Sequence, residues 1–144
     1  MKTKLYFAYG MNLDHDHMRE ACPTAIPIGP RRIDGYRIEY RCFANIVESD
    51  PDDCVWGGCW AIDAKAEECL DRIEVYPDLY DKIYIDGMLT YQMIKDKYPF
   101  MEPSIEYLKT VQRGLADFGL VSKTIHKKIG GSKWESRGQE YVWY

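Results

Sequence analysis

The sequence predicts an α+β domain: a small mixed, largely antiparallel β-sheet or β-barrel flanked by helices. Three observations lead to this prediction. Strand-like segments dominate the first two thirds of the chain, turn signals such as Asp34-Gly35 and Asp86-Gly87 join neighbouring segments, and helical periodicity returns after Pro103. Strands joined by such turns pair antiparallel, and strands followed by helices are typical of the α+β class. The 144 residues suit one domain, expected over residues 1–131 and extended by 132–144.

Composition excludes several classes of function. The net charge of −4 offers no basic surface for nucleic acid or an anionic membrane. No segment approaches the ~20 apolar residues of a membrane span. The five cysteines are odd in number and form no C-x-x-C pair, which favours buried free thiols in a reducing cytoplasm over disulfides or zinc. We therefore expect a cytoplasmic protein.

The first element is a strand that ends in a glycine turn. The apolar, aromatic run Leu5–Tyr9 reads as a buried strand, Gly10 permits a sharp turn, and a short helix is expected over His15–Ala21. Together they place backbone N–H groups without partners at residues 10–13, a good site for an anion or a carbonyl oxygen. A plain strand–turn–helix junction is the alternative interpretation. Asn12 either contacts substrate through its side chain or caps the helix.

The expected strands that follow are 25–33, 36–42, 44–47, 54–62, 80–86 and 88–95, the first of them irregular or at an edge. Segment 54–62 contains Gly57 and carries bulky residues such as Trp60, so it reads as a central strand that another backbone approaches closely.

Three helices are expected after residue 62. Asp63 caps the first, whose apolar stripe of Ala66, Leu70 and Ile73 ends near Glu74. A second follows Pro103, with an apolar face at Ile105, Leu108, Val111, Leu115 and Phe118. Ser122 begins a short last helix closed by Gly130-Gly131, and the tail 132–144 adds an edge strand or contacts a second subunit in a homodimer.

Glu74 is the strongest candidate for chemistry. It lies four residues after Leu70, on or beside the buried face of its helix, at the end where the helix dipole is negative. Burial and the dipole both disfavour the carboxylate, so the pKa of Glu74 is expected to rise toward the value that a general acid/base needs. A surface glutamate at a helix end is the simpler interpretation. His15 and His17 point to different faces of a helix, so we expect no metal site from them.

Two motifs carry a family resemblance. Tyr6-Phe7-Ala8-Tyr9-Gly10-x-Asn12-Leu13 resembles the first signature of the γ-glutamylcyclotransferase-like (AIG2-like) family, whose loop is usually YGSNL. Val55-Trp56-Gly57 through Trp60, Leu70-Asp71-Arg72-x-Glu74 and then Tyr80 resemble its second signature. The likeness extends over about residues 5–130. Met11 departs from the usual serine, and Val75 from a glycine that often follows the glutamate.

The resemblance implies a compact mixed β-barrel flanked by helices and an enzyme that converts a γ-glutamyl amine or peptide to 5-oxoproline and a free amine. It implies Glu74 as the catalytic acid/base, with no metal or coenzyme. The substrate-binding residues that it implies are Tyr9, Gly10, Met11, Asn12, Leu13 and Tyr80. Two other interpretations stay open: a non-catalytic binding module on the same scaffold, favoured by Met11, and an amine transferase or hydrolase whose product has no ring.

Overall fold

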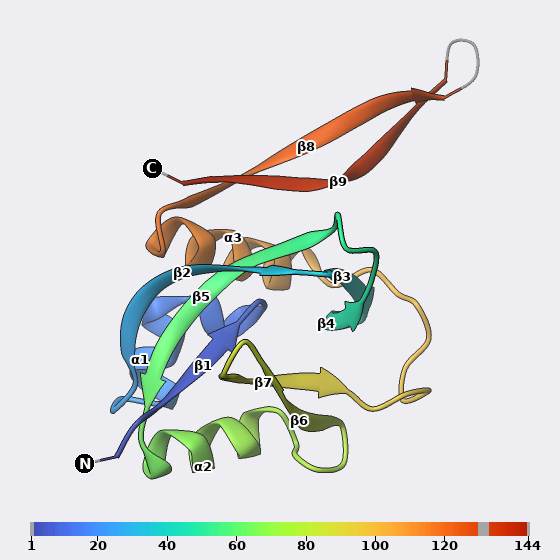
Figure 1. Cartoon of the computed structure of the whole chain (residues 1–144). Helices are drawn as coiled ribbons and strands as arrows, with labels where there is room; N and C mark the ends of the chain where they lie inside the picture. Colours follow the sequence, from blue (N-terminus) through green and yellow to red (C-terminus); the bar gives the residue numbers. More distant parts are fainter. Residues whose placement is uncertain (1, 130–132, 144) are drawn as a thin grey trace.

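The computed structural model of the chain describes the backbone of residues 2–129 and 133–143, with side chains as far as residue 121. It confirms the α+β class: a five-stranded sheet, two smaller two-stranded sheets and three α-helices in the described part (Figure 1). The elements are β1 (Lys4–Ala8), the 3-10 turn η1 (Met11–Leu13), α1 (His15–Ala21), β2 (Ile26–Asp34), β3 (Tyr36–Arg41), β4 (Phe43–Glu48), β5 (Cys54–Ile62), α2 (Ala64–Ile73), β6 (Tyr80–Ile85), β7 (Met88–Met93), α3 (Ile105–Asp117), β8 (Leu120–Ile129) and β9 (Lys133–Trp143).

The main sheet has the strand order β2-β5-β1-β7-β6. Its pairs are antiparallel except for β1 with β7, which is parallel. Between residues 2 and 129 the main-sheet strands do not close into a barrel, because β2 and β6 stand at open edges. Of the two architectures that the sequence allows, the protein has the sheet.

β5 is the central strand that the sequence predicts, and its glycines allow two close approaches. A Cβ atom on Gly57 would lie 2.3 Å from the carbonyl oxygen of Ala8 in the neighbouring strand. A Cβ atom on Gly58 would lie 2.2 Å from the ring of Phe118. Both distances are far below van der Waals contact, so larger side chains would force β1 or the end of α3 away.

The two faces of the sheet have different covers. Tyr6 and Trp60 are register partners on one face, and their cluster contains buried residues of α1, α2 and α3. Phe7 and Cys59 are register partners on the opposite face, and their cluster contains Ile46 of the β3–β4 hairpin. The three helices therefore gather on one side, where the ends of β1 and α2 come close together.

α3 begins after Ser104, whose side chain accepts a hydrogen bond from the N–H of Tyr107 at 3.1 Å. The predicted apolar face is partly wrong: Ile105 is 67% exposed, and Val111, Gly114 and Leu115 are the buried residues of the helix. The buried stripe therefore starts at Tyr107, four residues before Val111. None of the helices in residues 2–129 is long and apolar enough to cross a membrane.

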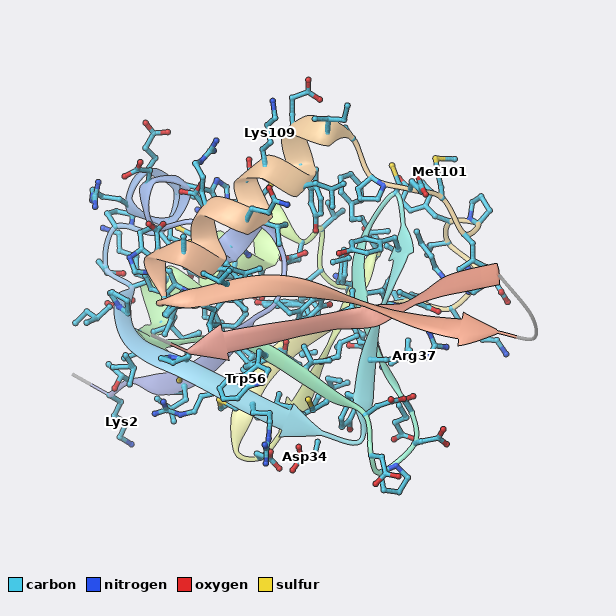
Figure 2. The ribbon with its side chains drawn as sticks, turned by 90° about the horizontal axis from the view of Figure 1, so that it is seen from above. Lys2, Asp34, Arg37, Trp56, Met101 and Lys109 are labelled. Carbon is cyan, nitrogen blue, oxygen red and sulfur yellow. The ribbon has the colours of Figure 1, made fainter. Side chains whose placement is uncertain are left out.

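The last helix expected from the sequence is wrong, because residues 120–129 form β8 and pair with β9. Four of these ten residues are β-branched, which favours a strand over a helix. The predicted helix end at residues 130–131 lies outside the described residues. The tail does add a strand, as one interpretation had it, but β9 pairs with β8 and not with the main sheet. Seen from above, the hairpin runs beside α3 (Figure 2).

Candidate active site

A cavity of about 330 Å³ opens where η1, β4, α3 and the end of α2 meet. Its wall contains residues of both sequence motifs: Gly10, Met11 and Asn12 of the first and Glu74 of the second. The two motifs touch directly, since the Asn12 side-chain nitrogen donates a hydrogen bond to Oε1 of Glu74 at 3.0 Å. The fold thus brings together two segments that lie 62 residues apart.

Glu74 reaches the cavity because of how α2 begins and ends. Asp63 caps the helix by accepting a hydrogen bond from the N–H of Ala66 at 2.8 Å. Ala66 and Leu70 are fully buried and fix the rotation of the helix against the core. Glu74 is the C-cap, and the following Val75 has a φ of 51°, which ends the helix in a left-handed turn.

Burial raises the pKa of Glu74 to about 7, against the Asn12 hydrogen bond, which lowers it. The residue keeps partial exposure because its carboxyl group faces the cavity, yet protein atoms surround that group. Among the described residues that line the cavity, none is a lysine, arginine or histidine. A carboxyl group with no cation beside it therefore exchanges its proton near neutral pH.

Asn12 is held by three hydrogen bonds. Its side-chain nitrogen donates to the hydroxyl of Tyr6 at 3.0 Å as well as to Glu74, and its amide oxygen lies 2.9 Å from Nε2 of His17. Because an amide oxygen can only accept, Nε2 of His17 must carry the proton. Burial lowers the pKa of His17, which keeps the ring neutral near pH 7. His17 thereby orients the amide so that its N–H faces Glu74.

This contact gives His17 a position that the sequence did not predict. The ring of the other histidine, His15, lies 5.0 Å from that of Trp60 and 4.6 Å from that of Phe118. The two histidines therefore point in different directions, as their spacing predicted. Asp14, and not Asn12, caps α1 by accepting hydrogen bonds from backbone N–H groups.

The predicted tyrosines line the cavity with their rings while their hydroxyl groups are engaged elsewhere. The hydroxyl of Tyr9 donates to the carbonyl of Tyr91, and that of Tyr80 donates to the carbonyl of Ala44 at 2.9 Å. Leu13 is fully buried and does not line the cavity. The hydroxyl groups of Tyr9 and Tyr80 thus make hydrogen bonds to the backbones of β7 and β4.

The backbone of η1 supplies polar groups to the cavity. The first N–H groups of a helical turn have no acceptor within that turn, and here they belong to residues that line the cavity wall. α3 supports this turn closely: a Cβ atom on Gly114 would lie 2.4 Å from the carbonyl carbon of Leu13. The turn is therefore fixed from behind by a helix.

Tyr107 is a cavity residue that the sequence analysis missed. Its hydroxyl accepts a hydrogen bond from the N–H of Ala44 at 3.0 Å and another from the N–H of Met11. Burial raises the pKa of Tyr107 to about 12, so the hydroxyl keeps its proton and can donate it in a hydrogen bond. The available signal was its spacing of four residues from Val111, on the face of α3 that turned out to be buried.

Comparisons with known proteins indicate the family of this chain. The family model described as gamma-glutamyl cyclotransferase, AIG2-like, matches residues 6–111. A solved structure named "Gamma-glutamyl cyclotransferase" is 25% identical with a TM-score of 0.72, over 82% of this chain and 81% of the other. An uncharacterized protein from Homo sapiens is 26% identical with a TM-score of 0.74, over 83% and 82%.

A third solved structure shares the fold. YkqA from Bacillus subtilis is 19% identical with a TM-score of 0.68, over 82% of this chain and 50% of the other. A search of curated proteins found no match. The family match spans both signature motifs, the cavity wall between them and the first turns of α3. The chain therefore belongs to the gamma-glutamyl cyclotransferase, AIG2-like family.

Proposed function

We propose that the protein is an enzyme that converts a γ-glutamyl amine or peptide to 5-oxoproline and a free amine, with Glu74 as the general acid/base. The observation that carries the proposal is the Glu74 carboxyl group, whose pKa is raised to about 7 and which lines the same cavity as Gly10, Met11 and Asn12. Family membership supports the same reaction class. A small γ-glutamyl compound fits a cavity whose volume lies near the lower end of the range for ligand sites.

The reaction needs one group that first removes a proton and then returns it. The α-ammonium of the γ-glutamyl group gives a proton to the Glu74 carboxylate, and the neutral nitrogen attacks the γ-carbonyl carbon. A carbon–nitrogen bond forms and closes the five-membered ring. The bond to the leaving nitrogen then breaks, and this nitrogen takes the proton from Glu74. The ring nitrogen gives its second proton to the Glu74 carboxylate, which passes it to the released amine, so the products are a neutral lactam and an ammonium. No water is consumed. A pKa near the working pH suits both proton transfers.

Charge develops on the carbonyl oxygen during the attack. Gly10, Asn12 and Tyr107 line the cavity, and the backbone N–H groups of the first two and the hydroxyl of the third are the donors that we assign to this oxygen. The N–H of Met11 already donates to the Tyr107 hydroxyl. Loss of one such donor typically costs about 2.7–4 kcal/mol of transition-state stabilisation. Asn12 stays bonded to Glu74 and positions it, while the rings of Tyr9 and Tyr80 shape the wall.

The test replaces Glu74 by glutamine, which preserves size and can still accept the hydrogen bond from Asn12. We expect Glu74→Gln to lower kcat by about 10²- to 10⁴-fold on a γ-glutamyl amide, because general acid/base catalysis typically contributes that factor. Mass spectrometry of 5-oxoproline measures the effect. Glu68→Gln is the matched control, since Glu68 lies in the same helix and is exposed. Equal turnover by wild type and Glu74→Gln contradicts the mechanism.

The same assay separates the second candidate function. Met11 stands where the family signature usually has serine, and this favours a module that binds a γ-glutamyl compound without cleaving it. Such a protein binds the amides in calorimetry yet releases neither 5-oxoproline nor amine. A transferase or hydrolase releases the amine and leaves a product without the ring. Each result is distinct in the mass spectrum.

A further inference from the structure

We infer that the leaving amine of the substrate is uncharged and apolar, a simple alkyl or aryl amine and not an amino acid. The inference rests on the proposed function and adds the class of the leaving group. Its basis is the exposed apolar part of the cavity lining, the side chains of Met11, Phe43, Ile73, Val75 and Tyr98, which we call the apolar rim.

Each residue of the apolar rim is unusually exposed for its type. Their exposed fractions lie between 37% and 48%, although all five are large hydrophobic or aromatic residues. Single exposed apolar residues are ordinary, but a group gathered around one cavity marks a surface that a ligand covers. Two residues of the apolar rim, Ile73 and Val75, adjoin Glu74 in the sequence. We place the leaving end of a γ-glutamyl compound against them.

The polar side chains of the cavity wall near Glu74 already make hydrogen bonds within the protein. The Tyr80 hydroxyl donates to the carbonyl of Ala44, and the Tyr107 hydroxyl accepts the N–H of the same residue. Asn12 is held by Tyr6, Glu74 and His17. The polar side chains next to Glu74 are therefore already paired within the protein, and the apolar rim contributes mainly apolar surface to the leaving amine.

A charged leaving group would find no counterion here. Glu74 is the only charged residue among the described residues that line the cavity, so a carboxylate on the leaving amine would meet a second carboxylate. The nearby cation Arg41 is committed to Glu39 at 3.0 Å and to the carbonyl of Tyr98 at 2.8 Å. Lys82 is committed to Glu67 and Asp71. An amino acid as leaving group would thus be bound without compensation for its charges.

Val75 gives a second, independent indication. Its φ of 51° lies in the left-handed region, which β-branched residues disfavour and which glycine adopts freely. A strained residue in a cavity wall points to a functional reason for keeping that side chain. Val75 and Met11 are also the two positions at which the chain departs from the family signatures, and both place an apolar side chain in the same rim.

The test is a series of γ-glutamyl amides that differ only in the leaving amine. From methylamine to n-pentylamine, kcat/KM is expected to rise about two- to fourfold per methylene, the gain from covering each group with apolar surface. Two matched pairs isolate charge: γ-glutamyl-isoamylamide against γ-glutamyl-leucine, and γ-glutamyl-n-pentylamide against the ε-linked γ-glutamyl-lysine. The apolar member should be at least about tenfold better in each pair.

Variants of the apolar rim test whether its side chains cause the preference for apolar leaving amines. Val75→Asn introduces a polar residue that tolerates the left-handed region. We expect this variant to lower the ratio of kcat/KM for the n-pentylamide to kcat/KM for the methylamide by about threefold or more. Met11→Gln, similar in length and polar, tests the rim at a second residue. Ile28→Asn is the matched control, because Ile28 is 49% exposed on the edge strand β2 and does not line the cavity. This control should keep the wild-type ratio.

The outcomes separate the inference from the proposed function. If the methylamide yields 5-oxoproline but kcat/KM is flat along the series, or charged and apolar partners react equally, the inference is overturned and the enzyme assignment stands. If no amide yields 5-oxoproline, the proposed function fails, and calorimetric affinities for the same amides decide the inference: affinity that rises with chain length supports it, and constant affinity overturns it.

Discussion

The two ends of α2 carry glutamates in opposite electrostatic states. At the first end, burial would raise the pKa of Glu67, but hydrogen bonds from Lys4 and Lys82, both at 2.8 Å, hold it below its ordinary value. At the other end, burial raises the pKa of Glu74 to about 7, because its partner is the neutral amide of Asn12. The two carboxyl groups lie seven residues apart. The comparison teaches that the partner, and not burial alone, decides whether a carboxyl group is a structural anchor or a proton carrier.

The largest expected effect is on the pH dependence of catalysis. The base must be ionised, so kcat/KM should fall toward tenfold per pH unit below the pKa of Glu74, or about 50-fold between pH 7 and pH 5. Initial rates of 5-oxoproline release measure this limb, and circular dichroism at each pH shows whether the fold persists. If kcat/KM stays constant down to pH 5, where Glu67 is still ionised, then Glu74 is ionised there too. The two glutamates of α2 would then not differ in their state near neutral pH.

The second prediction concerns stability, where the same substitution should have opposite signs. Because the pKa of Glu74 is raised in the folded state, the contribution of this group to stability is fully present below about pH 4.5. That contribution is lost as the pH rises toward 7. Glu74→Gln should therefore raise the free energy of unfolding at pH 8 by on the order of 2 kcal/mol, and by little at pH 4.5.

The lowered pKa of Glu67 gives the reverse dependence. Its contribution is present above the unfolded-state pKa and is lost as pH falls. Glu67→Gln should lower the free energy of unfolding by about 1 kcal/mol at pH 8, with the difference fading in acid. Urea unfolding of both variants at the two pH values checks the prediction. Equal signs for the two variants would contradict it.

The third prediction concerns a variant with a cation near Glu74, since the described residues of the cavity wall include none. Val75→Lys places an ammonium group at the cavity, and we expect the acid limb of kcat/KM to move down by about half to one pH unit. Val75→Met, of similar length without charge, is the control and should leave the limb in place. The shift should shrink in 1 M salt, since the added charge is exposed. An unmoved limb in low salt would mean that another group controls the profile.

The smallest expected effect comes from His17, which acts through Asn12. His17→Phe removes the donor that orients the amide, weakening the hydrogen bond that lowers the pKa of Glu74. The acid limb should move up by about a few tenths of a pH unit. His17→Gln retains a donor and should restore the wild-type limb. A purely structural role for His17 would lower stability in both variants without moving the limb.

Local patterns were enough to predict the strands up to residue 93 and the helix that carries Glu74. Alternation, the Asp86-Gly87 turn and the stripe of Ala66 and Leu70 depend on neighbours within a few residues, so the sequence shows them directly. The raised pKa of Glu74 followed from its place on that helix. The wrong helix at residues 122–131 depended on Ser122 as a cap, whereas the strand there depends on pairing with residues 133–143.

Contacts across long separations could not be predicted. Nothing near Asn12 in the sequence indicates that its amide reaches Glu74, or that His17 holds it from behind. Tyr107 was missed because the apolar face of α3 was drawn through Ile105, which is exposed, and the true face shows only through packing on η1. The sequence indicates candidate residues for chemistry, and the packing of distant elements decides which of them touch.

The Tyr107 hydroxyl joins Met11 and Ala44, and the cavity wall draws on residues from Tyr6 to Tyr107. A fragment that lacks either β1 or α3 therefore cannot complete the cavity wall. A molecule lodged there would brace the whole domain at once, and we expect it to slow amide hydrogen exchange in β1, β4, α2 and α3 together. Occupancy of this cavity would report that the elements between Tyr6 and Tyr107 have folded together.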